Sequence, residues 1–200
     1  MLARVTPLRF AALLAVLFAV AAGSAAGASS PPKFVGPAIV HPSTAPDFAL
    51  RDQHRRVVRL AALRGKVVLV TFLYTHCPDL CPFTAINLNN ALRQLGPRAR
   101  NTVVLAVTVD PKGDTPASVA SFVRSHRLLP QFHYLTGSRQ QLARIWRVYG
   151  VSSVRPGGGD PDHTLYTLLL DRHGKTRVLF DALAKPGAIA HDAGLLLARA

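Results

Sequence analysis

The sequence predicts an α/β sandwich in which a central mixed sheet is flanked by helices. Strand patterns alternate with helical patterns along the chain, which is typical of sheets whose central strands are parallel. The last two strand patterns are joined by a short turn, so they predict an antiparallel hairpin that makes the sheet mixed. One strand ends in a pair of cysteines at the start of a helix, and this placement points to the thioredoxin-like variety of the class.

Six strand patterns are visible, at residues 48–50, 57–60, 67–74, 103–109, 165–170 and 177–180. The first two flank a polar turn and predict a short hairpin. The third and fourth are apolar and rich in β-branched side chains, which indicates central strands that are covered on both faces. The last two flank a turn at residues 171–175 and predict the second hairpin.

Four helices are predicted from apolar periodicity and from residues that favour helix ends. The first follows the cysteines, and we expect it to bury a stripe of four apolar residues: Ile86, Leu88, Leu92 and Leu95. Thr115, with Pro116 directly after it, predicts the start of the second helix. The third is predicted to begin after Ser138 and to end at Gly150. The last is predicted to begin near Pro186 and to close the chain.

The first 28 residues are expected to be a signal peptide or a membrane anchor. Arg4 and Arg9 provide positive charge before an unbroken apolar run at 10–22, and Ala26-Gly27-Ala28 fits a cleavage site of small residues. The apolar run is short for a helix that spans a membrane, which needs about 20 residues. If the run is extended to Ala28 it approaches that length, so an uncleaved membrane anchor is the alternative. Residues 29–44 are rich in Pro, Ser and Gly and predict a linker, so that 45–200 form the predicted domain.

The leader predicts export, to a bacterial periplasm, with the domain either soluble or tethered to the inner membrane. The formal net charge of +14 would indicate nucleic acid as the partner of a cytosolic protein. An exported location argues against nucleic acid, and the arginines are scattered rather than clustered with aromatic residues. We therefore expect a solvated basic surface, with anionic lipid head groups or an acidic partner protein as the alternative.

Cys77 and Cys81 are the only cysteines among 200 residues, and they could form a structural disulfide, a redox pair or two arms of a metal site. A disulfide across so short a loop would contribute only about 2 kcal/mol, and a chain of this length can bury a core without one. Thioredoxin-like redox motifs place two residues between the cysteines, whereas three lie here, which gives two thiolates room around one ion. The start of a helix favours thiolates, and thiolates select Cu(I).

A third metal ligand would have to be an imidazole, which also suits Cu(II). The chain has eight histidines: His41, His54, His76, His126, His133, His163, His173 and His191. His163 lies in a loop that leads directly into the strand at 165–170. In a thioredoxin-like sheet this loop is expected beside the cysteine turn, so His163 is the candidate, and an ordinary surface histidine is the alternative.

The segment 75–82, Thr-His-Cys-Pro-Asp-Leu-Cys-Pro, resembles the signature of the Sco/SenC family of copper-binding assembly proteins. Four further segments continue the resemblance in order, at 110–116, 135–138, 149–151 and 162–164. The resemblance covers the chain from about residue 45 to the end. It implies a thioredoxin-like fold and a copper site made by Cys77, Cys81 and His163. It also implies that Asp110 orients a ligand or contacts the partner. The alternative is that Asp110 is an ordinary turn residue after a strand.

The resemblance implies a metallochaperone that binds one copper ion, as Cu(I) or Cu(II), and assists assembly of the dinuclear copper centre of cytochrome c oxidase. The partner would be the copper-centre subunit of that oxidase or another periplasmic copper protein, and we expect a monomer that is not a classical enzyme. The alternative is a thiol–disulfide oxidoreductase in which Cys77 attacks and Cys81 resolves, reducing the cysteines of a copper protein. A peroxidase of the peroxiredoxin type fits poorly, because no arginine lies near the motif in sequence.

Overall fold

The computed structural model describes residues 33–154, 162–163 and 165–198, with only the backbone described at 153–154 and 162–163. Residues from Lys33 onward form one compact unit. The predicted signal or anchor at 1–28 lies outside the described residues. The glycine-rich loop before the predicted ligand His163 does so as well.

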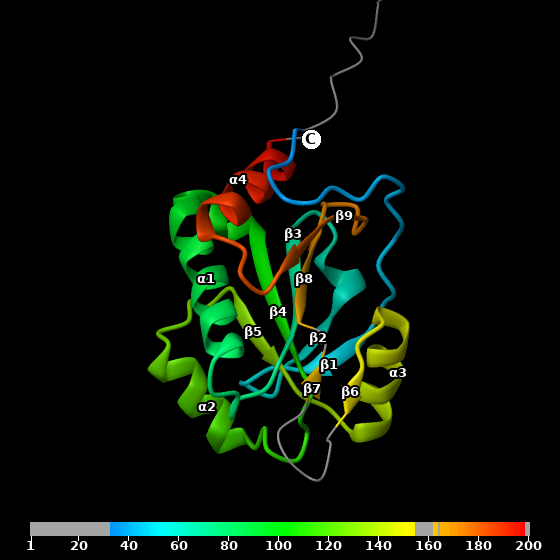
Figure 1. The fold of residues 1–200 in the computed structure, drawn as a ribbon, viewed down its shortest axis with the longest axis vertical. Helices are drawn as coiled ribbons and strands as arrows, with labels where there is room; N and C mark the ends of the chain where they lie inside the picture. Colours follow the sequence, from blue (N-terminus) through cyan, green and yellow to red (C-terminus); the bar gives the residue numbers. More distant parts are fainter. Residues whose placement is uncertain (1–32, 155–161, 164, 199–200) are drawn as a thin grey trace, which may run out of the picture. The chain divides into compact units, whose positions relative to one another are not determined.

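A five-stranded mixed sheet forms the centre of this unit, in the order β5-β4-β3-β8-β9 (Figure 1). β3 (Val67–Leu73), β4 (Thr102–Thr108) and β5 (Phe132–Leu135) are parallel to one another. β8 (Tyr166–Leu170) and β9 (Thr176–Asp181) form an antiparallel hairpin, and β8 also runs antiparallel to β3. The predicted class, a thioredoxin-like sandwich with a mixed central sheet, is confirmed.

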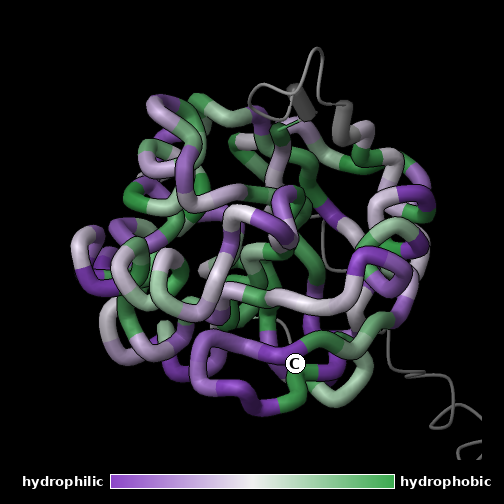
Figure 2. The backbone as a smooth tube through the Cα atoms, turned by 90° about the horizontal axis from the view of Figure 1, so that it is seen from below, coloured by the Kyte–Doolittle hydropathy of each residue, from purple (hydrophilic) through white to green (hydrophobic). Residues whose placement is uncertain are grey.

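Helices cover both faces of the sheet, which is why every residue of β3 and of β4 is buried. α1 (Leu80–Leu95), α2 (Pro116–Ser125) and α4 (Pro186–Leu197) lie on one face, and α3 (Arg139–Tyr149) lies on the other (Figure 1). Figure 2 shows the resulting core, with hydrophobic backbone segments through the middle and hydrophilic ones at the periphery. No helix within the described ranges is long and apolar enough to cross a membrane.

Two small antiparallel sheets accompany the main one. β1 (Ala49–Arg51) and β2 (Val57–Arg59) form the predicted first hairpin, which continues into the short 3-10 helix η2 (Leu60–Leu63). β6 (Ser153–Val154) pairs with β7 (Asp162–His163) shortly before β8 begins. A second 3-10 helix, η3 (Gly96–Asn101), connects α1 to β4.

The predicted starts of α2 and α3 are confirmed, and each is capped by the expected side chain. The Thr115 hydroxyl accepts a hydrogen bond from the backbone N–H of Ser118 at the start of α2. Ser138 and Gln141 form a reciprocal capping box at the start of α3, which ends at Gly150 with a positive φ of 67°. Side-chain oxygens here satisfy amide groups that have no partner inside the helix, so the caps fix where each helix begins.

One strand of the main sheet was missed, and one sequence expectation is wrong. β5 was not predicted, because four residues give too short a pattern and only pairing with β4 makes this segment a strand. Ile86, expected in the buried stripe of α1, is 39% exposed. The helix instead buries the face that carries Cys81, Ala85 and Leu88, and at about 100° per residue Ile86 lies far from Leu88 around the axis.

The predicted linker, residues 29–44, is described from residue 33, and this part follows the edge strand β9. The Ile39 N–H donates to the carbonyl of Arg177 at 2.8 Å, and the Thr176 N–H donates to the carbonyl of Ser43 at 2.9 Å. The prolines of this segment do not prevent its pairing with β9. Along a sheet edge only alternate residues form backbone hydrogen bonds with the neighbouring strand, so a proline can occupy a position between them. The segment is therefore held to the sheet edge rather than detached from it.

The strand directions define two ends of the sheet. β3 and β4 finish at the end where β8 begins, and the cysteines follow β3, so we call this the cysteine end. At the other end, here the far end, β3, β4 and β9 begin and β8 finishes. Residues that directly follow the parallel strands meet at the cysteine end, and open α/β sheets commonly bind ligands beyond the carboxyl ends of their strands.

Candidate metal centre

Cys77 and Cys81 straddle the junction between β3 and α1. The N-cap residue Asp79 makes no side-chain cap hydrogen bond, and the backbone N–H of Cys81 donates instead to Cys77 Sγ at 3.3 Å. A sulfur atom thus takes the position in which a cap oxygen usually accepts from the first helical turn. Cys77 is half-buried, whereas Cys81 is fully buried, and neither forms a disulfide.

The two thiols have very different pKa values because a hydrogen bond joins them. A hydrogen bond from the Cys81 thiol to the Cys77 sulfur, helped by backbone N–H groups of Asp79 and Cys81, outweighs the effect of burial and lowers the pKa of Cys77 to about 5. The same hydrogen bond, together with burial, raises the pKa of Cys81. At neutral pH the pair is therefore a thiolate at Cys77 and a thiol at Cys81, and the anionic sulfur is the more accessible one.

This charge state gives a testable pH profile for Cys77. Because its pKa is lowered to about 5, the thiolate persists down to about pH 5, so alkylation by iodoacetamide should change little between pH 8 and pH 6 and fall only below that. An ordinary thiol, with a pKa near 8.5, would lose reactivity about tenfold for each pH unit over the same interval. Mass spectrometry of alkylated peptides measures the rate at each pH. Cys81→Ala removes the donated hydrogen bond and should move the inflection upward, and an inflection near pH 8.5 in the unaltered protein would contradict the assignment.

Asp114 anchors the cysteine loop to the sheet. Its buried carboxylate accepts hydrogen bonds from the Thr75 N–H at 2.8 Å, the Thr75 hydroxyl at 2.7 Å and the Tyr134 hydroxyl at 2.8 Å. The Thr108 hydroxyl is a fourth donor. One side chain thereby joins the start of the cysteine loop to the end of β4 and to β5. The sequence analysis missed this role, for which the only signal was the position of Asp114 within the segment 110–116.

Asp110, the predicted neighbour of the site, is buried behind the same loop. Its N–H donates to the Thr108 hydroxyl at 3.0 Å, and its carboxylate lies against Gly113. A Cβ atom on Gly113 would come within 2.2 Å of the Asp110 Oδ2 and within 3.2 Å of the His76 Nδ1. Gly113 therefore allows the carboxylate and the His76 ring to approach each other beside the cysteines, and any larger residue would displace one of them.

The predicted ligand His163 is described only as part of the backbone, where it pairs with Ser153. The chain direction nevertheless brings it to the cysteine end, because it precedes Thr167, which pairs with Thr71 of β3. Cys77 follows Thr71 at that same end. Among the side chains that the structure describes, no group of three Cys, His, Asp or Glu residues is placed to hold a metal, and the His163 side chain is not one of them.

The surroundings of the cysteines combine a polar hollow with an apolar patch. A hollow of about 300 Å³ beside the loop is lined by Thr75, His76, Ser118, Ser121, Phe122, Ser125 and His126. On the exposed side of α1, Leu80, Phe83 and Ile86 are 41%, 43% and 39% exposed. Exposed apolar side chains at helical spacing next to reactive sulfurs are typical of a surface that meets another protein.

Soft donors fit this site better than hard ones. Two sulfurs in direct contact, one of them anionic at neutral pH, suit a soft ion, and the nearby Asp114 carboxylate is already occupied by hydrogen bonds from Thr75 of the loop. Fold and site together define a thioredoxin-like protein with a thiol pair at a strand–helix junction, of which Cys77 is the accessible member. The family model SCO1/SenC matches residues 37–197, and the chain belongs to this family.

Similar proteins agree with this assignment. An SCO2-like protein of Rickettsia conorii is 30% identical over 135 residues, which is 64% of this chain and 65% of the relative. The mitochondrial SCO2 homolog of Bos taurus is 38% identical over 64% of this chain and 50% of its own length, so the match spans less than two thirds of these relatives. The structure of Bradyrhizobium japonicum ScoI, solved with copper bound, is 31% identical with a TM-score of 0.68 and covers 78% of this chain and 100% of that one.

Proposed function

We propose that this chain binds one copper ion through Cys77, Cys81 and His163 and assists the assembly of the dinuclear copper centre of cytochrome c oxidase. The observation that carries the proposal is the thiolate at Cys77 in contact with the thiol of Cys81, at the start of α1. Family membership and the copper bound to a relative of 31% identity support copper as the ion.

Each ligand has a distinct part in this proposal. Two thiolates hold Cu(I), while an imidazole from His163 completes a set that also holds Cu(II). Binding requires Cys81 to lose the proton that it shares with Cys77, so metal uptake releases a proton. Asp114 keeps the loop in place through Thr75, and Asp110 is proposed to orient a ligand or to contact the partner.

The proposed partner is the copper-centre subunit of the oxidase or another periplasmic copper protein. The apolar patch of Leu80, Phe83 and Ile86 lies on the exposed side of α1, which begins three residues after Cys77, so it is the proposed contact. The loop that carries the exposed Leu183 lies beside α1, because Thr84 and Asn87 donate hydrogen bonds to its backbone, and it is proposed to take part in the same contact. We propose an exported domain, with the N-terminal segment as signal or anchor.

Copper titration of the reduced protein beside His163→Ala tests the ligand set. We expect one copper per chain, with sulfur-to-copper charge-transfer absorption in the Cu(II) form. The alanine variant should lose affinity for Cu(II) about a hundredfold, equivalent to roughly 3 kcal/mol, and much less for Cu(I), because two thiolates satisfy Cu(I) by themselves. Competition with chelators of known affinity measures both constants.

His54→Ala is the matched control, since His54 is exposed in the turn between β1 and β2, and it should change neither affinity. Equal losses for Cu(I) and Cu(II) in His163→Ala would remove His163 from the ligand set. A different result would be that the chain binds no copper and reduces a partner's disulfide without metal, in the His163→Ala variant as well. That result would replace the proposed chaperone function by that of a thiol–disulfide oxidoreductase.

A further inference from the structure

Positively charged residues lie along the far end of the sheet, opposite the cysteines. Arg100 precedes β4, Lys66 precedes β3, Arg172 follows β8 and Lys175 precedes β9. These strands are neighbours in the sheet order, and the register pairs the first residue of β3 with that of β4. Adjacent strands lie about 4.8 Å apart, so the four residues form a line of positive charge across the edge.

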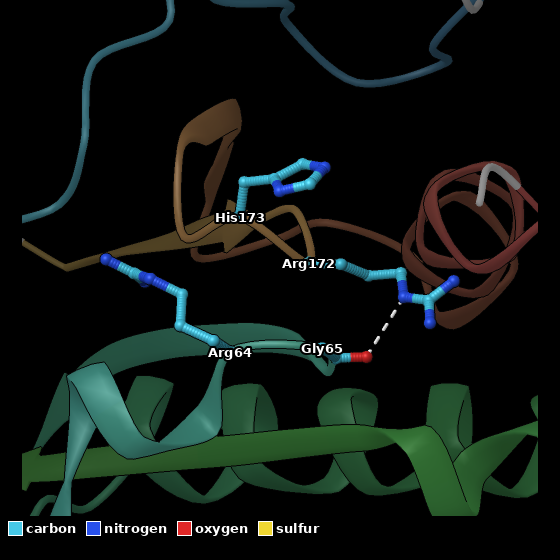
Figure 3. A pocket seen from close by; sticks show the side chains of 4 residues that line it. All are labelled: Arg64, Gly65, Arg172 and His173. Carbon is cyan, nitrogen blue, oxygen red and sulfur yellow. Dashed lines mark hydrogen bonds between the residues drawn. The ribbon is translucent and has the colours of Figure 1, made fainter.

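A hollow of about 420 Å³ opens in this row, lined by Arg64, Gly65, Arg172 and His173 (Figure 3). Its two walls come from the turn before β3 and the turn between β8 and β9. The Arg172 Nε donates a hydrogen bond to the Gly65 carbonyl at 3.0 Å and thereby joins the two turns. Figure 3 shows the guanidinium groups of Arg64 and Arg172 extending to opposite sides of the hollow, so their N–H donors, which suit phosphate oxygens, are spread along this end rather than aimed at one point.

The carboxylate of Asp171, in the turn that forms one wall, is engaged by other groups. Asp171 Oδ1 accepts the N–H groups of His173 and Lys175, both at 2.9 Å, and Oδ2 forms an ion pair with Arg177 at 3.1 Å. The carboxylate thus stabilises the turn and the arginine of β9. The cations Arg64, Lys66 and Lys175 remain exposed around the opening.

The Arg64 guanidinium is held in place by the shape of this turn. A Cβ atom on Gly174 would lie 1.4 Å from Arg64 Nη1, so the guanidinium crosses directly over the glycine. Gly174 also has a positive φ of 72°, which L side chains rarely adopt. Glycine at this position therefore both forms the turn and admits the arginine.

We propose that the far end docks on an anionic lipid surface, whose head-group phosphates pair with the cations around the hollow. Cations spread over four neighbouring strand ends match a plane of phosphates better than they match one small ligand, and each Lys or Arg near such a surface contributes about 1 kcal/mol. The described chain also begins at this end, beside the end of α4 (Figure 1). The 32 residues before it contain the apolar run at 10–22.

Docking in this way directs the cysteine end away from the lipid, toward the aqueous phase. The thiol pair and the apolar patch of α1 would then stay open to a partner while the domain rests on the membrane. This inference does not depend on copper binding, because none of its residues belongs to the proposed metal site.

Vesicle flotation of the full chain tests the proposal, with phosphatidylcholine vesicles compared with vesicles that also contain phosphatidylglycerol. The apolar run at 10–22 could insert into either bilayer, so the informative quantity is the ratio of the two binding constants. We expect a clear preference for the anionic vesicles at low salt that disappears at high salt. Substituting glutamine for Arg64, Lys66, Arg100 and Lys175 should lower that ratio by about three orders of magnitude.

The matched control removes four exposed arginines of α2 and α3, as R124Q, R139Q, R144Q and R147Q, and should retain most of the preference. A second measurement needs no variant: a water-soluble maleimide should alkylate Cys77 equally fast with and without anionic vesicles. Membrane docking would be overturned if the two quadruple variants lost the preference equally, or if the unaltered chain showed no preference for phosphatidylglycerol. Protection of Cys77 by vesicles would also overturn it. So would displacement from the vesicles by millimolar inorganic phosphate but not by chloride of the same ionic strength.

Discussion

Replacing Cys81 with serine is expected to lower the affinity for Cu(I) at least about a thousandfold, equivalent to about 4 kcal/mol. Serine preserves the size of the side chain, but its hydroxyl is a hard donor that stays protonated, so a soft ion loses one of two strong bonds. Cys77→Ser should have an effect of similar size, because the proposed site uses both sulfurs. Titration with Cu(I) in competition with a chelator of known affinity measures the loss.

The two serine variants differ in what they do to the fold, and this provides the internal control. Cys77 is half-buried and Cys81 fully buried, so only Cys81→Ser places a new hydroxyl in the core. We expect a drop of about 1 kcal/mol in the free energy of unfolding for Cys81→Ser and almost none for Cys77→Ser. Nearly unchanged Cu(I) affinity in either folded variant would show that copper does not require both sulfurs.

Asp114→Ala is expected to lower the free energy of unfolding by about 3 kcal/mol, because it leaves a set of buried donors without their acceptor. The affected donors are the backbone N–H and hydroxyl of Thr75 and the hydroxyls of Thr108 and Tyr134. The cysteine loop begins at Thr75, so loss of this anchor should also speed copper release. Urea unfolding measures the first effect, and copper transfer to a chelator measures the second.

Asp181→Ala is the matched control for this prediction. Asp181 is exposed at the end of β9 and accepts one backbone hydrogen bond, from Leu183 at 2.9 Å, so its removal should cost less than about 1 kcal/mol. Asp114→Asn retains the shape but converts part of the acceptor into a donor, and an intermediate loss is expected. A loss below about 1 kcal/mol in Asp114→Ala would mean that water or another group takes over its partners.

Local patterns predicted the secondary structure well where a segment is long or capped by its own residues. β3 and β4 are apolar along their whole length, and Ser138 with Gln141 caps α3 through contacts within a few residues. β5 escaped prediction because pairing with β4, rather than its four residues, makes it a strand. Ile86 was misplaced because apolar character alone does not say which side of α1 faces the sheet.

For the site, the sequence by itself determined the chemistry: two cysteines with three residues between them, after a buried strand and at the start of a helix. Neighbours along the chain impose that juxtaposition whatever the rest of the fold does. Only the tertiary structure decided that Asp114, and not Asp110, anchors the loop, and that cations from four strand ends form one row at the far end. These groups are distant in sequence, and they meet because the order and direction of strands bring them together, which no local pattern encodes.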